Sequence, residues 1–335
     1  MAISIQGGEI LKVLVYGAGV IAAYLAYELK KKNEDVTILA RGERYKELKE
    51  NGLIIKHYLQ KRKTITDIKV IDSFKSDDYY DVVFIVMQSY QVKEILPIIY
   101  ANKICKAYVF IGNNFEAGKI YKEIEEKSFS KPKVLFGFLG VGGRRENGTV
   151  ISIHKGKSTL AMGSVNNEYS IEKVNRIFKD SNIKLEHYDN IDSYLKYHIA
   201  YILPIVYLCH HVNGNLKEAA HNKPLIKDTI EAIIEGYRVL QSLNITSEPI
   251  DYLEDMESSR KKYYYLYKLM LMTPIGKLAF GNHAMNAIKE MNFLAEAFDE
   301  LKASSPIDTP YYNKLRKDLK KCNYLLRLKK ALGRN

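Results

Sequence analysis

Cysteines and long apolar runs are scarce in this sequence. Three cysteines, Cys105, Cys209 and Cys322, lie far apart, so they predict no disulfide framework and favour a reducing, cytoplasmic location. The longest apolar run, about Ile199 to Cys209, is shorter than the roughly 20 residues that a membrane span needs. No basic stretch followed by an apolar core opens the chain, so no signal peptide is predicted.

The overall composition excludes several classes of protein. Hydrophobic residues make up 47% and charged residues 27% of the 335 residues, which excludes a disordered or low-complexity chain. The length suits two domains. Lys and Arg number 51 against 39 Asp and Glu, a formal charge of +12, which would suit a nucleic-acid surface, a membrane surface or a pocket for small anions.

Most of this positive charge lies near the end of the chain. Residues 315–335 contain eight basic side chains against one acid, Asp318, and so account for +7 of the +12. Leu315, Leu319, Cys322 and Leu326 form an apolar stripe at helical spacing in the same segment. The excess charge is therefore interpreted as the solvated face of a terminal amphipathic helix, and no nucleic-acid motif accompanies it.

The first half of the chain alternates short apolar runs with helical patterns. Strands alternating with crossover helices, notably 21–31 and 91–100, predict a doubly wound parallel α/β sheet of the Rossmann type. The predicted strands are Lys12–Tyr16, Val36–Ala40, Asp67–Ile71, Val82–Met87, Tyr108–Gly112 and Val134–Leu139.

The pattern changes after residue 140 and again near residue 190. Residues 140–148 (GVGGRRENG) are glycine-rich and basic; 149–154 with 158–162 predict an antiparallel hairpin, 170–180 a helix and 184–188 a last strand. Beyond that point only helices are predicted, with Thr309 as the hydroxyl cap before Pro310 of the last one. We therefore predict a Rossmann-type domain over 1–190 and an all-helical domain over 191–335. The predicted helices span 192–212, 223–243, 249–270, 284–302 and 309–332.

The strongest motif lies between the first strand and the first helix. Gly17-Ala18-Gly19-Val20-Ile21-Ala22 has the GxGxxG/A spacing in a strand–loop–helix setting. Gly17 permits the tight turn, Gly19 lets a pyrophosphate approach the backbone, and Ala22 keeps the helix close to the strand. The helix start supplies free N–H groups and a positive dipole to phosphates. We predict a dinucleotide site here; the alternative is a glycine-rich turn without a ligand.

The end of the second strand favours NADP over NAD. An NAD enzyme places Asp or Glu there to hold the ribose hydroxyls, but this chain has Ala40 followed by Arg41. Arg41 and Arg44 flank Glu43, and a guanidinium is the natural partner of a 2′-phosphate. The alternative is that both arginines belong to a solvated helix start.

Other catalytic motifs are missing from the sequence. There is no Gly-x-Ser-x-Gly elbow and no Walker loop. His210 and His211 are adjacent, so on a helix they point apart, and no third ligand has suitable spacing. We predict no metal site.

Taken together, these segments resemble the ketopantoate reductase (2-dehydropantoate 2-reductase) family. The resembling stretches are VLVYGAGVIAAYLAYEL, VTILARGERYKELKENGL, DVVFIVMQSYQV, VFIGNNFEAG, NGTVISIHKGKSTLAMG, YLKYHIAYILPIV and EMNFLAEAFDEL followed by IDTP. The resemblance implies a Rossmann domain followed by a helical substrate domain. It also implies reduction of a 2-keto acid by NADPH in the cleft between the domains. Helical domains of this family often form dimers, so a homodimer is an expectation.

The resemblance also implies roles for single residues. Gly17, Gly19 and Arg41 match the NADP site, Gln91 a glutamine near the cofactor, and Asn113 an asparagine beside the nicotinamide. Lys196 resembles the catalytic lysine of the family, and Glu290 a glutamate near the substrate. The glycine-loop residues Ala18, Val20 and Ile21 complete the expected cofactor site together with Gln88, which stands where the family commonly has a lysine.

Two side chains compete for the role of proton donor. A ketone that receives a hydride needs an acid at its oxygen, and an ordinary lysine, with a pKa of about 10.4, arrives protonated. Lys196 and His198 are two positions apart and therefore point to different sides of a helix. We predict Lys196 as the acid; the alternatives are a surface Lys196 and a core histidine at 198. Glu290 would bind a substrate hydroxyl or orient Lys196, or else be a surface glutamate.

Three hypotheses about function follow. The first is NADPH-dependent reduction of a small 2-keto acid such as ketopantoate to the 2-hydroxy acid, a step of pantothenate biosynthesis. The second is an NADP-binding protein with another carbonyl substrate or a non-catalytic redox-sensing role, suggested by Gln88 and by Ala200 to Pro204, where the family has asparagines. The third, nucleic-acid binding, rests on charge alone.

Overall fold

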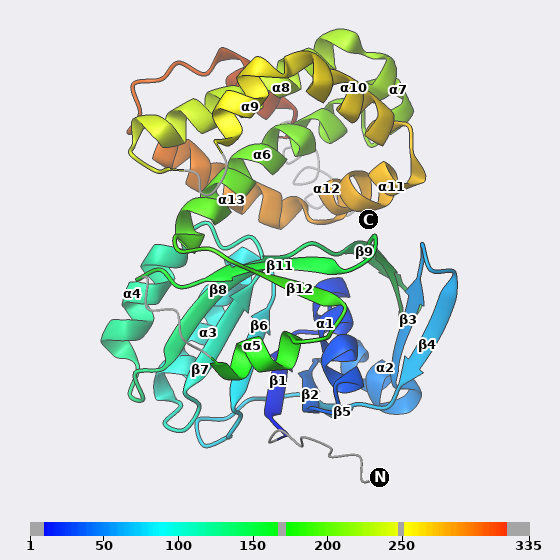
Figure 1. Cartoon of the computed structure of the whole chain (residues 1–335), viewed down its shortest axis with the longest axis vertical. Coiled ribbons are helices and arrows are strands. Elements are labelled where there is room, and N and C mark those ends of the chain that lie inside the picture. Colours follow the sequence, from blue (N-terminus) through cyan, green and yellow to red (C-terminus); the bar gives the residue numbers. More distant parts are fainter. Residues whose placement is uncertain (1–9, 167–171, 247–250, 320–335) are drawn as a thin grey trace, which may run out of the picture.

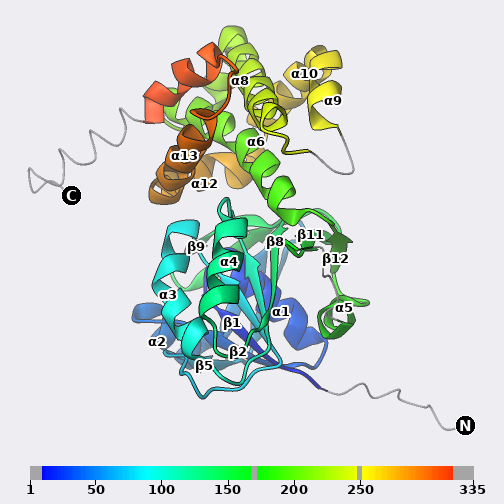
Figure 2. The same cartoon turned by 90° about the vertical axis from the view of Figure 1, so that its left-hand side faces the viewer.

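The computed structural model describes residues 10–166, 172–246 and 251–319, and the chain forms two stacked parts. Figure 1 shows a sheet domain below and a layer of helices above, and the long helix α6 (Ile191–His211) links them. Turned by 90°, α6 rises from the sheet domain into the helical one (Figure 2). The predicted fold class, a Rossmann-type sheet followed by a helical portion, is confirmed.

The main sheet has eight strands in the order β12-β11-β8-β7-β6-β1-β2-β5. All neighbours are parallel except β8 and β11, which are antiparallel. Its central strands are continuous apolar runs because both faces are covered by helices. The strands are β1 (Lys12–Tyr16), β2 (Asp35–Leu39), β5 (Lys69–Ile71), β6 (Val82–Val86), β7 (Ala107–Ile111), β8 (Lys133–Leu139), β11 (Ser158–Gly163) and β12 (Ile183–His187).

Helices cover the two faces of this sheet and divide its core in two. Alternate residues of β1 point to opposite faces: Val13 packs with α1 (Val20–Lys31) and α5 (Glu172–Phe178), while Leu14 packs with α3 (Ser89–Ala101) and α4 (Ala117–Lys127). Helices α1, α3 and α4 each follow a parallel strand, so all three begin at the same edge of the sheet, facing the helical domain.

The predicted hairpin of residues 149–154 and 158–162 is wrong, because its first strand belongs to a second sheet. The four strands of this sheet, β3 (Leu53–His57), β4 (Arg62–Thr66), β9 (Gly142–Glu146) and β10 (Thr149–Ile153), lie in the order β4-β3-β10-β9. Strand β10 pairs with β9 and β3, whereas β11 belongs to the main sheet, so the two predicted hairpin strands do not pair. The basic stretch 140–148 is largely strand β9, which the sequence analysis did not predict, and β3 and β4 were not predicted either.

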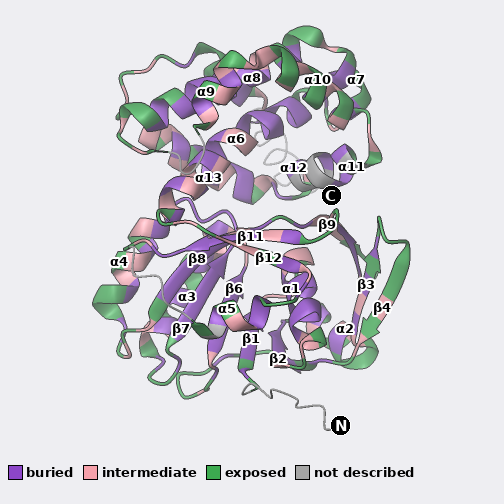
Figure 3. Cartoon of the chain, viewed as in Figure 1, coloured by how far each residue is buried: buried purple, intermediate pink, exposed green. Residues whose placement is uncertain are grey.

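The helical domain packs around α6, most of whose residues are buried (Figure 3). The predicted helix over 249–270 is two helices, and the six-residue α7 was not predicted. The further elements are α7 (Leu216–His221), α8 (Lys223–Ser242), α9 (Tyr252–Ser258), α10 (Arg260–Leu271), α11 (Pro274–Gly276), the π-helix η1 (Lys277–Gly281), α12 (Asn282–Asn286), α13 (Ile288–Lys302) and a last helix over 310–319. The remainder of the predicted helix 309–332, with most of its positive charge, lies outside the described residues.

The last helix begins at Pro310 as predicted, but its N-terminal N–H groups have an unexpected acceptor. The amides of Tyr311 and Tyr312 donate to the two carboxylate oxygens of Glu235, at 3.1 and 2.7 Å. Glu235 is buried in α8, and burial raises its pKa, while the two amides oppose that rise. A carboxylate 75 positions away therefore caps this helix in place of the predicted Thr309 hydroxyl. None of the helices among the described residues is both long enough and apolar enough to span a bilayer.

We expect Glu235→Ala to lower the free energy of unfolding by about 1–3 kcal/mol, because two N–H donors, of which that of Tyr312 is buried, lose their acceptor at a helix N-terminus. Thr309→Val, which removes the predicted hydroxyl cap and keeps the side-chain shape, should lower the free energy of unfolding by less than Glu235→Ala does. Urea denaturation of both variants checks this. A larger loss in Thr309→Val than in Glu235→Ala would return the capping role to Thr309.

Candidate active site

A cavity of about 880 Å³ lies between the edge of the main sheet and the helical domain. Its walls come from the glycine loop, the ends of β6 and β7, the segment from β8 to β9, α6 and the start of α13. All nine side chains or loop positions predicted to bind the cofactor line it: Gly17, Ala18, Gly19, Val20, Ile21, Arg41, Gln88, Gln91 and Asn113. Glu290 lines it too, but Lys196 does not.

The glycine loop is shaped by one close backbone contact. Gly17 has a φ of +123°, and a Cβ there would lie 2.2 Å from the carbonyl oxygen of Val86 at the end of β6. Only glycine allows this approach. Gly19 is different: a Cβ built on it meets no protein atom within 4 Å. The missing side chain of Gly19 therefore does not relieve a contact within the protein; it leaves space in the cavity in front of the loop.

The start of α1 carries no negative charge of its own. Gly19 is the N-cap, no side chain among the described residues caps the helix, and its first turn has no acidic residue. Its first N–H groups and its positive dipole end therefore face the cavity and suit an anion.

Arg44 lies deep at this end of the cavity. It is 8% exposed; its Nε donates to the Ala18 carbonyl at 3.4 Å, and its Nη1 donates to the Gly148 carbonyl at 2.8 Å and to Glu47 at 3.1 Å. Its Nη2 is buried and donates to no group among the described residues. Burial lowers the pKa of this guanidinium, which Glu47 partly offsets. A buried cationic donor without an acceptor is suited to an anionic ligand.

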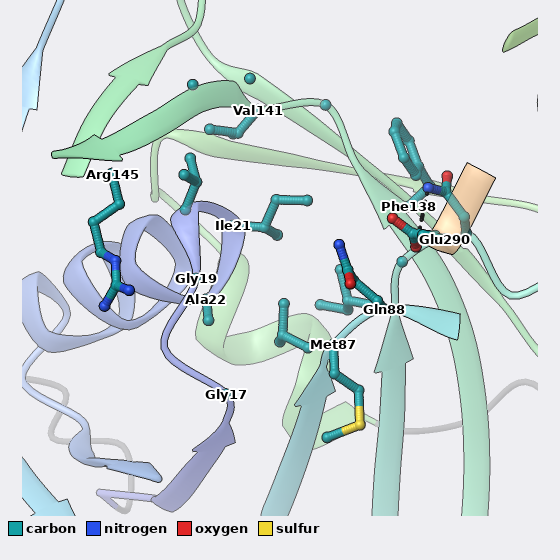
Figure 4. A pocket seen from close by; sticks show the side chains of 18 of the residues that line it. Gly17, Gly19, Ile21, Ala22, Met87, Gln88, Phe138, Val141, Arg145 and Glu290 are labelled. Carbon is teal, nitrogen blue, oxygen red and sulfur yellow. Dashed lines mark hydrogen bonds between the residues drawn. The ribbon is translucent and has the colours of Figure 1, made fainter. Parts of the chain in front are cut away.

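Arg145 is a cavity residue that the sequence analysis did not assign. It projects from β9 over α1, at the opposite end of the cavity from Glu290 and Phe138 (Figure 4). Its Nη1 lies 3.4 Å from the Glu47 carboxylate that also binds Arg44. Arg41 lines the same cavity and is exposed. The two arginines within the glycine-rich run 140–148 were the only signal, and strand alternation separates them: Arg145 lines the cavity, whereas Arg144 pairs with Glu146 outside it.

The other end of the cavity is built around the buried carboxylate of Glu290. This group, 3% exposed on α13, accepts long hydrogen bonds of 3.4 Å from the Ser89 amide and from Asn113 Nδ2. The Ser89 hydroxyl donates to the Asn113 carbonyl. Burial raises the pKa of Glu290 to about 7, although these donors favour its charged form. Glu290 is thus not the surface glutamate considered as its alternative.

Asn113 also presents an unused acceptor. Its Oδ1 is buried and accepts no hydrogen bond from the described residues, while its Nδ2 is held by Glu290. Gln88 and Gln91 lie nearby at the start of α3, where the Gln88 amide donates to Gln91 Oε1 at 3.3 Å. Gln91 therefore helps to cap its own helix.

Helix α6 turns one face to the cavity. His198 on this face packs against Phe138 of β8, with ring centroids 3.9 Å apart and an interplanar angle of 40°. Its other cavity residues, Tyr201, Ile202, Ile205 and Val206, are mainly apolar.

Lys196, the predicted acid, belongs to another face of α6. Its ammonium pairs with Asp192 one turn earlier and lies 5.8 Å from the centre of the Phe115 ring. Asp192 in turn accepts the Gly118 amide at 3.1 Å, at the start of α4. In this structure Lys196 completes a link between the domains, outside the cavity.

The adjacent histidines at the end of α6 have separate partners. His210 Nε2 lies 3.2 Å from the Ala284 carbonyl, and His211 Nδ1 lies 2.9 Å from Asp318. In the described part of the chain no three His, Cys, Asp or Glu side chains form a cluster that could hold a metal ion.

Comparison with known proteins gives a consistent picture. The ketopantoate reductase family (PanE/ApbA) matches residues 13–167. The uncharacterized oxidoreductase YkpB of Bacillus subtilis is 26% identical over 164 residues, which are 47% of this chain and 50% of that protein. This match thus spans about half the length of that relative.

Solved structures extend the likeness to the whole fold. D-mandelate dehydrogenase, in a ternary structure with NADH and anilino(oxo)acetate, has a TM-score of 0.72 at 16% identity, covering 93% of this chain and 98% of that one. A dimeric ketopantoate reductase from Staphylococcus aureus has a TM-score of 0.66 at 15% identity, covering 93% and 98%. The predicted resemblance to the ketopantoate reductase family is confirmed by the match over residues 13–167, and the solved structures share the fold of both domains.

The raised pKa of Glu290 predicts a change of stability with pH. Because its pKa rises from 4.5 to about 7 on folding, its contribution is most favourable below pH 4.5 and is lost as pH rises to 7. Glu290→Gln cannot ionise, so we expect its stability relative to the wild type to be about 2 kcal/mol greater at pH 8 than at pH 5. Urea denaturation at both pH values checks this; an equal difference at both would contradict the raised pKa.

Proposed function

We propose that this chain, whose sheet domain matches the ketopantoate reductase family, reduces a 2-oxo acid to the 2-hydroxy acid with NADPH. One observation carries the proposal. A single cavity joins an α1 N-terminus flanked by arginines to the buried group of Glu290 and Asn113. Each end holds a buried polar atom without a partner among the described residues, Arg44 Nη2 and Asn113 Oδ1.

These two atoms fit a dinucleotide that lies along the cavity. The α1 N-terminus would hold its pyrophosphate, and Asn113 Oδ1 would accept a hydrogen bond from the carboxamide or ribose. When bound, the reduced nicotinamide supplies a hydride to a carbonyl carbon. The residues of this chain would orient the oxo acid beside Asn113 and Glu290, exclude water from it and deliver a proton to its oxygen.

The arginines support NADPH over NADH. Ala40 places no carboxylate at the end of β2, so no acceptor for ribose hydroxyls stands there, whereas Arg41, Arg44 and Arg145 all line this end of the cavity. Glu47, which neutralises part of this charge, bonds Arg44 Nη1 and Arg145 Nη1, and Arg44 Nη2 has no acceptor in the described part of the chain. A 2′-phosphate would supply the missing acceptor.

The face of α6 supports an apolar side chain on the oxo acid. Ile202, Ile205 and Val206 border the cavity together with Phe138. Filling such a surface removes apolar area from water, and each added methylene is worth about 1 kcal/mol. We therefore propose a 2-oxo acid with a branched or aromatic side chain.

The decisive experiment follows NADPH oxidation across 2-oxo acids. We expect turnover, with kcat/KM for 4-methyl-2-oxopentanoate or phenylglyoxylate about tenfold or more above that for pyruvate. Ketopantoate belongs in the panel and NADH serves as the alternative reductant. NADPH binding without turnover on any acid would favour a cofactor-binding or sensing role instead.

A glycine variant provides the matched control for cofactor binding. Gly19→Ala meets no protein atom, so the variant should unfold at the wild-type temperature yet bind NADPH at least tenfold more weakly, because its methyl group projects toward the pyrophosphate. Gly17→Ala should instead lower the melting temperature, since its Cβ collides with Val86. Thermal denaturation and fluorescence titration distinguish the two; unchanged NADPH affinity in Gly19→Ala would contradict the proposed phosphate position.

Arg145 tests the choice between NADPH and NADH. Arg145→Ala should raise the Kd for NADPH about 10- to 100-fold, the effect of losing one charge-assisted contact of roughly 1.5–3 kcal/mol. The Kd for NADH should change little. Arg144→Ala, one position earlier but outside the cavity, is the matched control. Equal losses for both cofactors in Arg145→Ala would argue against a 2′-phosphate at this position.

A further inference from the structure

We propose that His198, not a lysine, contacts the carbonyl oxygen of the substrate and donates the proton to it. This inference rests on the proposed reductase function. It starts from the arrangement of α6, which brings an imidazole to the cavity wall and turns its nearest lysine, Lys196, to another face.

Position singles out His198 among the basic side chains of the described cavity wall. Arg41 and Arg44 follow β2, Arg145 lies on β9, and His154 and Lys155 follow β10, whose neighbour in the fold is α1. His154 itself packs against Tyr24 of α1, with ring centroids 4.7 Å apart. These five groups therefore surround the glycine-loop region.

His198 belongs to the opposite end of the cavity. Its ring contacts Phe138, and Figure 4 shows Phe138 at the same end of the cavity as Glu290, away from Arg145. Glu290 in turn bonds Asn113, the residue proposed to hold the nicotinamide. Among the described residues of the wall, His198 is thus the one basic side chain at the end where the carbonyl would react.

The His198 ring is also held in position. It is half-buried, packs against Phe138, and is nearly parallel to Tyr194, with an interplanar angle of 12° and centroids 6.4 Å apart. Packing against aromatic rings restricts the orientation of an imidazole at the cavity wall.

Lys196 and Tyr201 are less suited than His198 to donate this proton. Lys196 would have to leave both the Asp192 carboxylate and the Phe115 ring, and Asp192 would lose the charge that balances it. Tyr201 lines the cavity, but burial raises the pKa of its hydroxyl, which weakens it as an acid.

The proton step balances as follows. The carbonyl carbon gains the hydride, the π electrons of the C=O bond move to oxygen, and that oxygen takes the proton from the His198 imidazolium. The products are the 2-hydroxy acid, the oxidised cofactor and a neutral imidazole, which regains a proton from solvent. Before the step, the imidazolium also supplies a positive charge beside the developing negative charge on oxygen.

Variants on one helix test the assignment. His198→Asn should lower kcat at least 100-fold, the usual contribution of a general acid being about 10² to 10⁴, with the Kd for NADPH within about threefold of wild type. Lys196→Met should retain kcat within a few-fold. His211→Asn, on the same helix but paired with Asp318 outside the cavity, serves as the matched control.

A second readout needs no turnover. In protein labelled with ¹⁵N-histidine, we expect the ring nitrogen signals that are missing from His198→Asn to shift when oxamate, a non-reducible oxo-acid analogue, is added with or without NADPH. The signals missing from His211→Asn should not move.

The outcomes separate the two proposals. Wild-type-like kcat in His198→Asn, an equal or larger loss in Lys196→Met, or His198 signals that ignore oxamate would overturn the role of His198 while leaving the reductase intact. Failure of the wild type to bind or oxidise NADPH would overturn the proposed function. The oxamate titration would then still decide whether His198 meets an oxo acid.

Discussion

The N-termini of three helices lie at one edge of the main sheet. Their unsatisfied N–H groups need acceptors, and this need determines which groups of the helical domain can pack against that edge. Helices α1, α3 and α4 follow parallel strands, so their positive dipole ends all face the helical domain. Two of them receive carboxylates from that domain: Glu290 accepts the Ser89 amide at the start of α3, and Asp192 accepts the Gly118 amide at the start of α4.

The third helix, α1, receives no such carboxylate from the described residues, and this difference supports the proposed phosphate site. Its first turn has no acidic residue, and Gly19 leaves open space before it. Of the three helix N-termini, the start of α1 is therefore the one suited to an anionic ligand. The contact with α3 buries the Glu290 carboxyl group, which is unfavourable for its charged form. Desolvation therefore raises its pKa to about 7, although the Ser89 amide and Asn113 donate to it.

Lys196 and His198 lie two positions apart on α6 and point to different faces of the helix. Two positions on a helix correspond to a rotation of about 200°, so Lys196 and His198 cannot face the same neighbour. Lys196 neutralises Asp192 and thereby supports the contact with α4, while His198 borders the cavity. The sequence favoured Lys196 at the reacting carbonyl and a core position for His198, whereas the structure pairs Lys196 with Asp192 and places His198 at the cavity wall.

Local patterns in the sequence determined much of the sheet domain. Continuous apolar runs located the central strands, and the Gly17–Ala22 spacing located the cavity-lining loop, because both depend on neighbouring residues and a fixed backbone geometry. The sequence pattern did not predict strand pairs whose members lie far apart in the chain. Nothing between 149 and 162 showed that β10 pairs with β3, about 95 positions earlier, and not with β11.

Tertiary structure alone decided which candidate side chains meet. Arg145 lies over α1 because β9 joins the second sheet, Glu235 caps a helix 75 positions later, and Glu290 reaches Ser89 across the domain boundary. The sequence by itself determined the residue types, the helical and strand periodicities and the glycine loop. The packing of α6 and α13 on the sheet edge decided burial, protonation and which face of each helix meets the cavity, since these depend on contacts between distant segments.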